Sequence, residues 1–143
     1  MALAGFKSLP LPISQLSLAV VLKCGQSFRW SIFEAPAGHA QSLEPGLQAE
    51  YRFCLKDRVV CLRQSPTTLY YKSVYPEPHP TPSQLAERDA DTLKWLHDYF
   101  QLKVDLVSLY NRWASADKVF AGFKDRFEGI RILRQDPWEN LIS

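Results

Sequence analysis

Apolar and polar residues alternate through the middle of the chain. Tyr51, Phe53 and Leu55 are separated by polar or charged neighbours, which is the period-two pattern of a half-buried strand. A short turn leads into residues 59–62, and a third run follows at residues 69–75, both rich in β-branched or aromatic residues. We therefore predict an antiparallel meander. Its aromatic side chains are interpreted as core and cross-strand partners, with a base-stacking surface as the alternative.

Four stretches precede this meander. Residues 6–12 contain two prolines and predict an irregular segment. Alternating Leu and Val residues over 16–22 favour a strand, with a short helix as the alternative. Alternating aromatic and aliphatic residues predict another strand around residues 28–33. The two prolines and two glycines in residues 35–46 predict a loop.

The hydrophobic period lengthens after a proline-rich connector, residues 76–82. Thr81, Pro82 and Gln84 combine a helix N-cap, a proline at the first helical position and a capping-box partner. The apolar face of the helix that follows is expected to comprise Leu85, Leu93, Leu96 and Phe100.

Three more helices are predicted from their capping residues. Asp105 is expected to cap the first of these, and Ser115 or Asp117 the second, which Gly129 would end. The inner face of that second helix would carry Phe120, Phe123 and Phe127. Asp136 would cap the last one. Because the strands come first and the helices after, the fold class is α+β.

Composition adds only broad limits. The chain has 143 residues, of which 46% are hydrophobic and 22% charged, and this suits one globular domain with a real core. No apolar run approaches the roughly 20 residues of a membrane span, so no membrane association is predicted. The net charge of +2 permits nucleic-acid binding without arguing for it.

The three cysteines, Cys24, Cys54 and Cys61, form no Cys-x-x-Cys pair. The N-terminus also lacks a basic segment followed by an apolar one, so we expect reduced thiols in the cytosol or nucleus. Cys54 and Cys61 are interpreted as small core residues in neighbouring strands. No metal site is predicted, because the cysteines and histidines lack the usual ligand spacing.

The stretch from Cys24 to Trp30, Cys-Gly-Gln-Ser-Phe-Arg-Trp, joins an apolar run to the first predicted long strand. Glycine at such a junction permits a positive φ and a close approach to the main chain. Gly25 either simply begins the strand or presents its carbonyl or amide to a ligand.

The final residues are the second informative stretch. Asp136 and Pro137 are expected to begin a helix, with Glu139 at the capping-box position and Trp138, Leu141 and Ile142 as apolar residues. An isolated helix needs about 12–15 residues to be even marginally stable, so this short one needs a partner surface. We therefore expect the chain to be a fragment of something longer.

Both stretches resemble the eukaryotic 8-oxoguanine DNA glycosylases. Gly-Gln-Ser-Phe-Arg-Trp at 25–30, Gly-Ile-Arg-Ile-Leu-Arg-Gln-Asp-Pro at 129–137, and the shorter motifs Pro-Thr-Pro at 80–82, Tyr-Phe-Gln-Leu at 99–102 and Leu-Tyr…Trp at 109–113 follow the family's order. The resemblance covers nearly the whole chain from about Pro10. Trp138 and Asn140 depart from the family's usual residues, which puts the packing of the last helix in doubt.

The resemblance implies a twisted antiparallel sheet with flanking helices, similar to the TATA-binding protein, followed in the family by a helix-hairpin-helix domain. It divides the chain into a leading segment (1–12), the glycosylase N-terminal domain (13–128) and the start of the connection to the absent catalytic domain (129–143).

The resemblance also implies a role for Gly25. In the family, a flipped 8-oxoguanine base donates its N7 hydrogen to the carbonyl of this glycine, and Gln26, Ser27 and Phe28 would support the pocket. The nucleophilic lysine and its aspartate lie in the family's second domain, so no catalytic residue is expected in this chain. No cofactor or metal is implied.

The expected partners are duplex DNA containing 8-oxoguanine and the missing helix-hairpin-helix domain, in a monomeric nuclear protein, with the mitochondrion as the alternative location. The chain alone is predicted to be inactive. A non-catalytic DNA-binding or protein-docking module and a non-functional truncation are the alternatives. Arg131 and Arg134 are predicted to pair with Asp136 or neighbouring carboxylates, with phosphate contact as the alternative.

Overall fold

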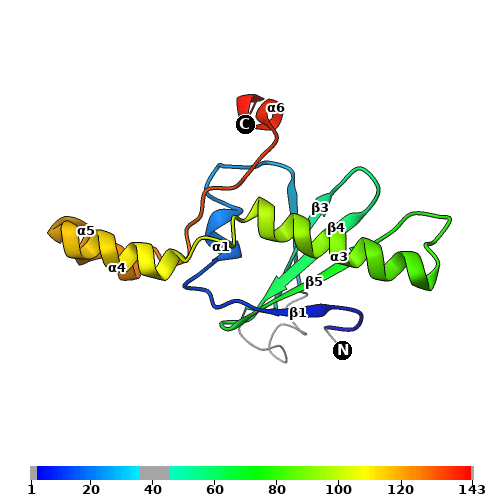
Figure 1. Ribbon diagram of the computed structural model, residues 1–143, viewed down its shortest axis with the longest axis horizontal. Helices are drawn as coiled ribbons and strands as arrows, with labels where there is room; N and C mark the ends of the chain where they lie inside the picture. Colours follow the sequence, from blue (N-terminus) through cyan, green and yellow to red (C-terminus); the bar gives the residue numbers. More distant parts are fainter. Residues whose placement is uncertain (1–2, 36–45, 143) are drawn as a thin grey trace. The chain divides into compact units, whose positions relative to one another are not determined.

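The computed structural model describes residues 3–35 and 46–142 (Figure 1). The chain divides into two compact units. A sheet unit comprises Met1–Pro12 and Arg29–Trp95, and a helical unit comprises Ile13–Phe28 and Leu96–Ser143. The expected loop at residues 35–46 falls almost wholly outside the described residues.

The sheet unit is built on a five-stranded antiparallel sheet. Its strands are β1 (Lys7–Pro10), β2 (Trp30–Glu34), β3 (Ala49–Cys54), β4 (Val59–Gln64) and β5 (Thr68–Val74), in the order β1-β5-β4-β3-β2. The predicted meander is confirmed in β3, β4 and β5, and β2 extends it. The irregular segment predicted at residues 6–12 is wrong, because Lys7–Pro10 pairs with β5 as an edge strand. Pro10 stands at the end of that strand, where a missing N–H is tolerated.

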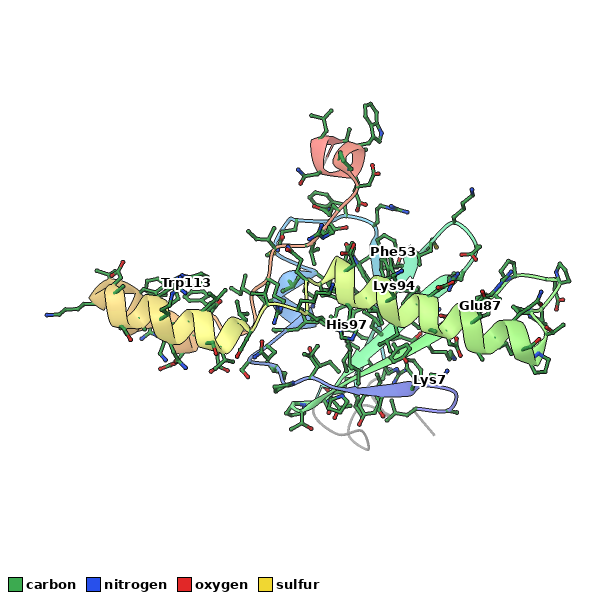
Figure 2. All side chains as sticks on the ribbon, in the orientation of Figure 1. Lys7, Phe53, Glu87, Lys94, His97 and Trp113 are labelled. Atoms are coloured by element: carbon green, nitrogen blue, oxygen red, sulfur yellow. The ribbon has the colours of Figure 1, made fainter. Side chains whose placement is uncertain are left out.

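One face of the sheet is covered by α3 (Pro82–Tyr99), as Figure 1 shows. Trp95 of this helix packs on Phe53, with ring centroids 5.3 Å apart, and Phe53 packs on Trp30 at 4.9 Å. Phe53 points from the sheet towards this helix in Figure 2. The hydroxyl groups of Ser73 and Thr92 add a hydrogen bond of 2.8 Å between sheet and helix. In the predicted meander Tyr51, Phe53 and Tyr71 are therefore core residues, as predicted, and Tyr70 is half-buried.

The start of α3 follows the predicted capping chemistry. The Gln84 side chain accepts a hydrogen bond from the Thr81 N–H at 3.0 Å, which is one half of a capping box. The apolar face was predicted less well: Leu96 and Phe100 are fully buried, whereas Leu85 is exposed. Of the two cysteines expected in the core, Cys61 is buried, but Cys54 is exposed and that prediction is wrong.

The helical unit contains α1 (Leu18–Val21), α4 (Leu106–Ala116), α5 (Lys118–Phe123), a 3-10 turn η1 (Lys124–Arg126) and α6 (Pro137–Ile142). The strand favoured over residues 16–22 is wrong, and the short helix is correct. Asp105 and Asp117 cap α4 and α5 as predicted, each accepting main-chain N–H bonds. No described helix is long and apolar enough to cross a membrane.

Aromatic side chains fasten α4 to α5. Trp113 lies 5.7 Å from both Tyr110 and Phe120, measured between ring centroids (Figure 2). Phe123 and Phe127 extend the cluster with edge-to-face contacts. Such pairs contribute about 0.5–1.5 kcal/mol each beyond the area they bury. The inner face predicted for this helix is only partly correct: Phe120 is half-buried, whereas Phe123 and Phe127 are exposed. The predicted end at Gly129 is wrong, because α5 ends at Phe123 and the 3-10 turn at Arg126, so Phe127 lies beyond both.

The cap of α4 predicts a pH dependence of stability. Donation from the Ser108 hydroxyl, the Gln15 amide and the Ser108 N–H lowers the pKa of Asp105 from 3.8 to about 2. Because the pKa is lower in the folded state, the carboxylate stabilises the fold above about pH 4 and loses this effect as the pH falls towards 2. We expect Asp105→Asn, which keeps an N-capping oxygen, to flatten the fall in melting temperature over this range. If the melting temperatures of the two proteins fell equally between pH 4 and pH 2, Asp105 would not be the source of this pH dependence.

Candidate functional site

The Gly25 loop, residues 24–28, follows α1 and precedes β2. Gly25 adopts a φ of +82° and is exposed. A Cβ built on it would meet no described atom within 4 Å. Glycine is therefore selected here by the left-handed backbone rather than by lack of space inside the chain. Its main chain is open to an approaching group.

Gln26 fixes the loop to the segment at residues 131–133. Its amide nitrogen donates to the carbonyl of Arg131 at 2.8 Å, and its amide oxygen accepts from the Leu133 N–H at 3.0 Å. The Gln26 amide thus pairs with one main-chain carbonyl and one main-chain N–H of this segment, as the backbone of a neighbouring β-strand would. The nitrogen also lies 3.2 Å from Cys24 Sγ.

Ser27 is the second anchor of the loop. Its side chain is buried, and its hydroxyl donates to Glu139 Oε1 of α6 at 2.9 Å. Phe28 behaves differently: it lies before the start of β2 and its side chain is 75% exposed. Gln26 and Ser27 therefore anchor the loop to other parts of the chain, whereas Gly25 and Phe28 lie on the surface; a role of any of them in a base pocket stays a prediction. The predicted strand around residues 28–33 begins two residues later than expected, so Phe28 does not share its face.

Arg131 belongs to the segment to which Gln26 is bonded, and its side chain makes a separate set of contacts. The residue is 5% exposed, and its guanidinium donates to the Gln15 carbonyl, to Gln15 Oε1 at 2.7 Å, and to the carbonyls of Gln101 and Val104 at 2.9 and 2.8 Å. Burial lowers the pKa of this guanidinium, which nonetheless stays charged at neutral pH. All four of these acceptors are amide oxygens, so the predicted carboxylate pairing is wrong, and burial removes the guanidinium from phosphate contact.

Arg134, three residues after Arg131, has an exposed side chain. It forms a 3.3 Å ion pair with Asp98, and both side chains are more than half exposed. The prediction of a carboxylate partner is confirmed for Arg134, although the partner is Asp98 rather than Asp136. Asp136 instead accepts the Trp138 N–H at 2.9 Å and starts α6.

Sequence reasoning named Gln26 and Ser27 beside Gly25 but missed the distant residues around them. Glu139 accepts from Ser27, and Gln15 and Gln101 accept from Arg131, all across large sequence separations that no local motif specifies. Glu139 was interpreted as a capping residue, a role that draws attention away from Ser27, 112 positions earlier.

The rest of the described chain offers little competing chemistry. Within residues 3–35 and 46–142, no group of three or more His, Cys, Asp or Glu side chains could hold a metal ion. The sheet unit has a small polar recess of about 80 Å³ beside the 2.7 Å ion pair of Lys7 and Asp89 (Figure 2 labels Lys7). Its lining includes none of the predicted site residues.

Known proteins resemble this chain over nearly its whole length. It is 38% identical to an N-glycosylase/DNA lyase of Saccharomyces cerevisiae over 140 residues, which are 96% of this chain and 33% of the relative. It is 27% identical to N-glycosylase/DNA lyase OGG1 of Arabidopsis thaliana, covering 94% of this chain and 31% of that protein. The chain therefore spans about a third of the curated relatives it matches.

A solved structure of MBOgg1 in complex with a low-affinity DNA ligand shares the fold, with a TM-score of 0.57 and 22% identity over 94% of this chain and 37% of that one. The family model for the 8-oxoguanine DNA glycosylase N-terminal domain matches residues 8–141. This match includes the Gly25 loop and both of its anchors. The chain belongs to the 8-oxoguanine DNA glycosylase N-terminal domain family.

Proposed function

We propose that this chain is the N-terminal, base-reading domain of an 8-oxoguanine DNA N-glycosylase and lyase that acts in base-excision repair. Family membership supports the class of enzyme. The observation that carries the proposal is the Gly25 loop: an exposed main chain in a left-handed conformation, held by two polar anchors.

The proposed role of Gly25 is to read one hydrogen atom. Guanine presents an acceptor at N7, whereas the oxidised base carries a hydrogen there. A fixed carbonyl oxygen accepts a hydrogen bond from the lesion and faces an unfavourable acceptor in guanine. An unmet buried polar group costs about 1–3 kcal/mol, which corresponds to a preference of roughly 5- to 150-fold. The base must be flipped out of the duplex to reach this carbonyl, and the exposed ring of Phe28 would form part of the pocket wall.

The remaining parts of the reaction are assigned to the rest of a longer protein. In this proposal residues 13–128 form the glycosylase N-terminal domain, and residues 129–143 begin the connection to a helix-hairpin-helix domain that supplies the lysine nucleophile and its aspartate. The partner would be duplex DNA containing 8-oxoguanine. The protein would be a monomer that works in the nucleus, with the mitochondrion as a second location.

The test compares this chain alone with a chimera in which it replaces the matching third of the Saccharomyces cerevisiae relative. Borohydride is added to each protein with a duplex that carries either 8-oxoguanine or guanine. We expect no covalent adduct from the chain alone, and an adduct from the chimera with the lesion duplex only. An adduct formed by the chain alone would refute its non-catalytic role. A folded chimera that treats both duplexes alike would refute the proposed reading of the base.

A docking module is the second candidate, and one observation favours it. Trp138, Leu141 and Ile142 of α6 are 67–74% exposed, which is unusual for apolar side chains on one short helix. If the chain were such a module, it would bind lesion and undamaged duplexes with equal, salt-dependent affinity, or would not bind them at all.

A further inference from the structure

Helix α6 buries a charged residue and exposes its apolar ones. Glu139 is its buried residue, at 8% exposure, whereas its large apolar side chains face outward. A helix normally buries its apolar residues and exposes its carboxylates. Burial of a carboxylate is unfavourable unless hydrogen bonds compensate for lost hydration. The orientation of α6 therefore implies that the contacts of Glu139 decide how this helix is seated.

The contacts of Glu139 lead to the Gly25 loop. Its Oε1 atom accepts from the buried Ser27 hydroxyl at 2.9 Å and lies 3.4 Å from the Gln135 amide nitrogen. A hydrogen bond to a charged acceptor is shorter and about twice as strong as one between neutral groups. The N-terminus of α6 is itself capped by Asp136, so the carboxylate is carried on a fixed backbone.

The Gly25 loop needs such a support. Glycine visits both positive and negative φ readily, so Gly25 alone does not fix the direction of its carbonyl. Gln26 binds the loop to the segment at 131–133, and Ser27 binds the next position to α6. Two consecutive side chains held by different segments define one orientation of the main chain that precedes them.

We propose that Glu139 is a positioning residue, which acts through the Ser27 hydroxyl to hold the Gly25 main chain in its left-handed conformation. The consequence for lesion recognition rests on the function proposed above, but the positioning itself does not. Release of Ser27 removes the bond from the loop to α6, so the Gln26 bonds to the 131–133 segment open more often.

Two adjacent amide hydrogens measure this release. The Leu133 N–H donates to the Gln26 side chain, whereas the Arg134 N–H donates to the Tyr99 carbonyl at 2.8 Å and does not involve the loop. We expect Ser27→Ala and Glu139→Ala each to raise the exchange rate of the Leu133 amide about tenfold, with that of Arg134 changed less than twofold. Glu139→Gln, which keeps an acceptor oxygen, should restore most of the protection. The double variant should exchange no faster than Glu139→Ala alone, because both substitutions remove the bond between Ser27 and Glu139, and only Glu139→Ala also removes the Gln135 contact.

Several results would overturn the proposal. One is an unchanged Leu133 rate in Ser27→Ala, which settles the question even if Glu139→Ala fails to fold. Others are an equal rise at Arg134, which would indicate melting of the whole segment, and additive effects in the double variant. In the chimera, Ser27→Ala should also lower the preference for lesion over guanine about fivefold. If the chimera shows no preference while the Leu133 amide responds, the proposed function fails and the positioning role of Glu139 stands.

Discussion

Gly129→Ala is expected to destabilise the protein by about 3 kcal/mol or more, among the largest effects of any single methyl group in this chain. Gly129 has a φ of +72°, and the left-handed region costs an alanine roughly 1–2 kcal/mol. Its Cβ would also lie 2.6 Å from Ser17 N and 3.0 Å from the Leu16 carbonyl carbon, and would overlap the Ile13 carbonyl oxygen. These are main-chain atoms that cannot move aside, and the Ser17 N–H already donates to the Gly129 carbonyl. Thermal unfolding should show a fall in melting temperature of about 10 °C or more.

Two other glycines separate the causes of this effect. Gly25→Ala also places an alanine in the left-handed region, at φ +82°, but no atom lies within 4 Å of the added Cβ. We therefore expect the free energy of unfolding to fall by about 1–2 kcal/mol. Gly122 lies inside α5 with free space around it, and alanine there should be neutral or stabilising by up to about 1 kcal/mol. If Gly129→Ala and Gly25→Ala destabilised the protein equally, the close approach of Gly129 to residues 13–17 would add nothing to the effect of the left-handed backbone.

The features that could be predicted from the sequence are those decided by neighbouring residues. Asp105, Asp117 and Asp136 each accept main-chain N–H groups two or three residues away, and the spacing alone predicted where their helices begin. The hairpin strands β3 and β4 followed from alternation around a short turn. The contacts that determine these elements are made between residues close in sequence.

The wrong predictions concern elements whose partners lie far away. Residues 16–22 alternate like a strand, but Leu16, Leu18, Val21 and Leu22 are all buried around a single helical turn, which alternation cannot distinguish over so few residues. Edge strand β1 forms because it pairs with β5, a partner about 60 residues further along the chain. The two prolines in and after this segment predicted an irregular structure instead. Cys54 was expected in the core as a small apolar residue, but the alternation of β3 places it on the same face as Arg52, and both are exposed.

The same distinction applies to the candidate site. The motif at residues 25–28 drew attention to the loop, and glycine's tolerance of positive φ agreed with the structure. What holds the loop was not predictable: Gln26 bonds main-chain groups 105 and 107 positions away, and Ser27 bonds a carboxylate 112 positions away. No local pattern specifies such pairs, because each depends on how α1, the 131–133 segment and α6 are brought together within the helical unit.

Arg131→Met is expected to cost about 3–4 kcal/mol, although methionine fills much of the same volume. The guanidinium donates to four oxygens on Gln15, Gln101 and Val104. Two of these keep another donor, since the Leu106 N–H also donates to Gln15 Oε1 and the Val104 N–H to the Gln101 carbonyl. The loss therefore falls on the Gln15 and Val104 carbonyls, at about 1–3 kcal/mol each before water or side-chain rearrangement compensates. Gln15 also links this group to the cap of α4, since its amide donates to Asp105 Oδ1 at 2.6 Å. Loss of the guanidinium should therefore loosen the start of α4 as well. Denaturant unfolding followed by circular dichroism measures the free-energy change.

Arg134→Met is the matched control, because it removes the same group from the same segment. Its ion pair with Asp98 is more than half exposed on both sides, and such pairs contribute about 0–1 kcal/mol. We expect less than about 1 kcal/mol of destabilisation, and a smaller effect still at high salt. Arg131→Lys adds a second comparison: one ammonium keeps the charge but cannot reach all four acceptors, so most of the loss should persist. If Arg131→Lys were as stable as the wild type, charge rather than the geometry of the five guanidinium donors would be what this buried position requires.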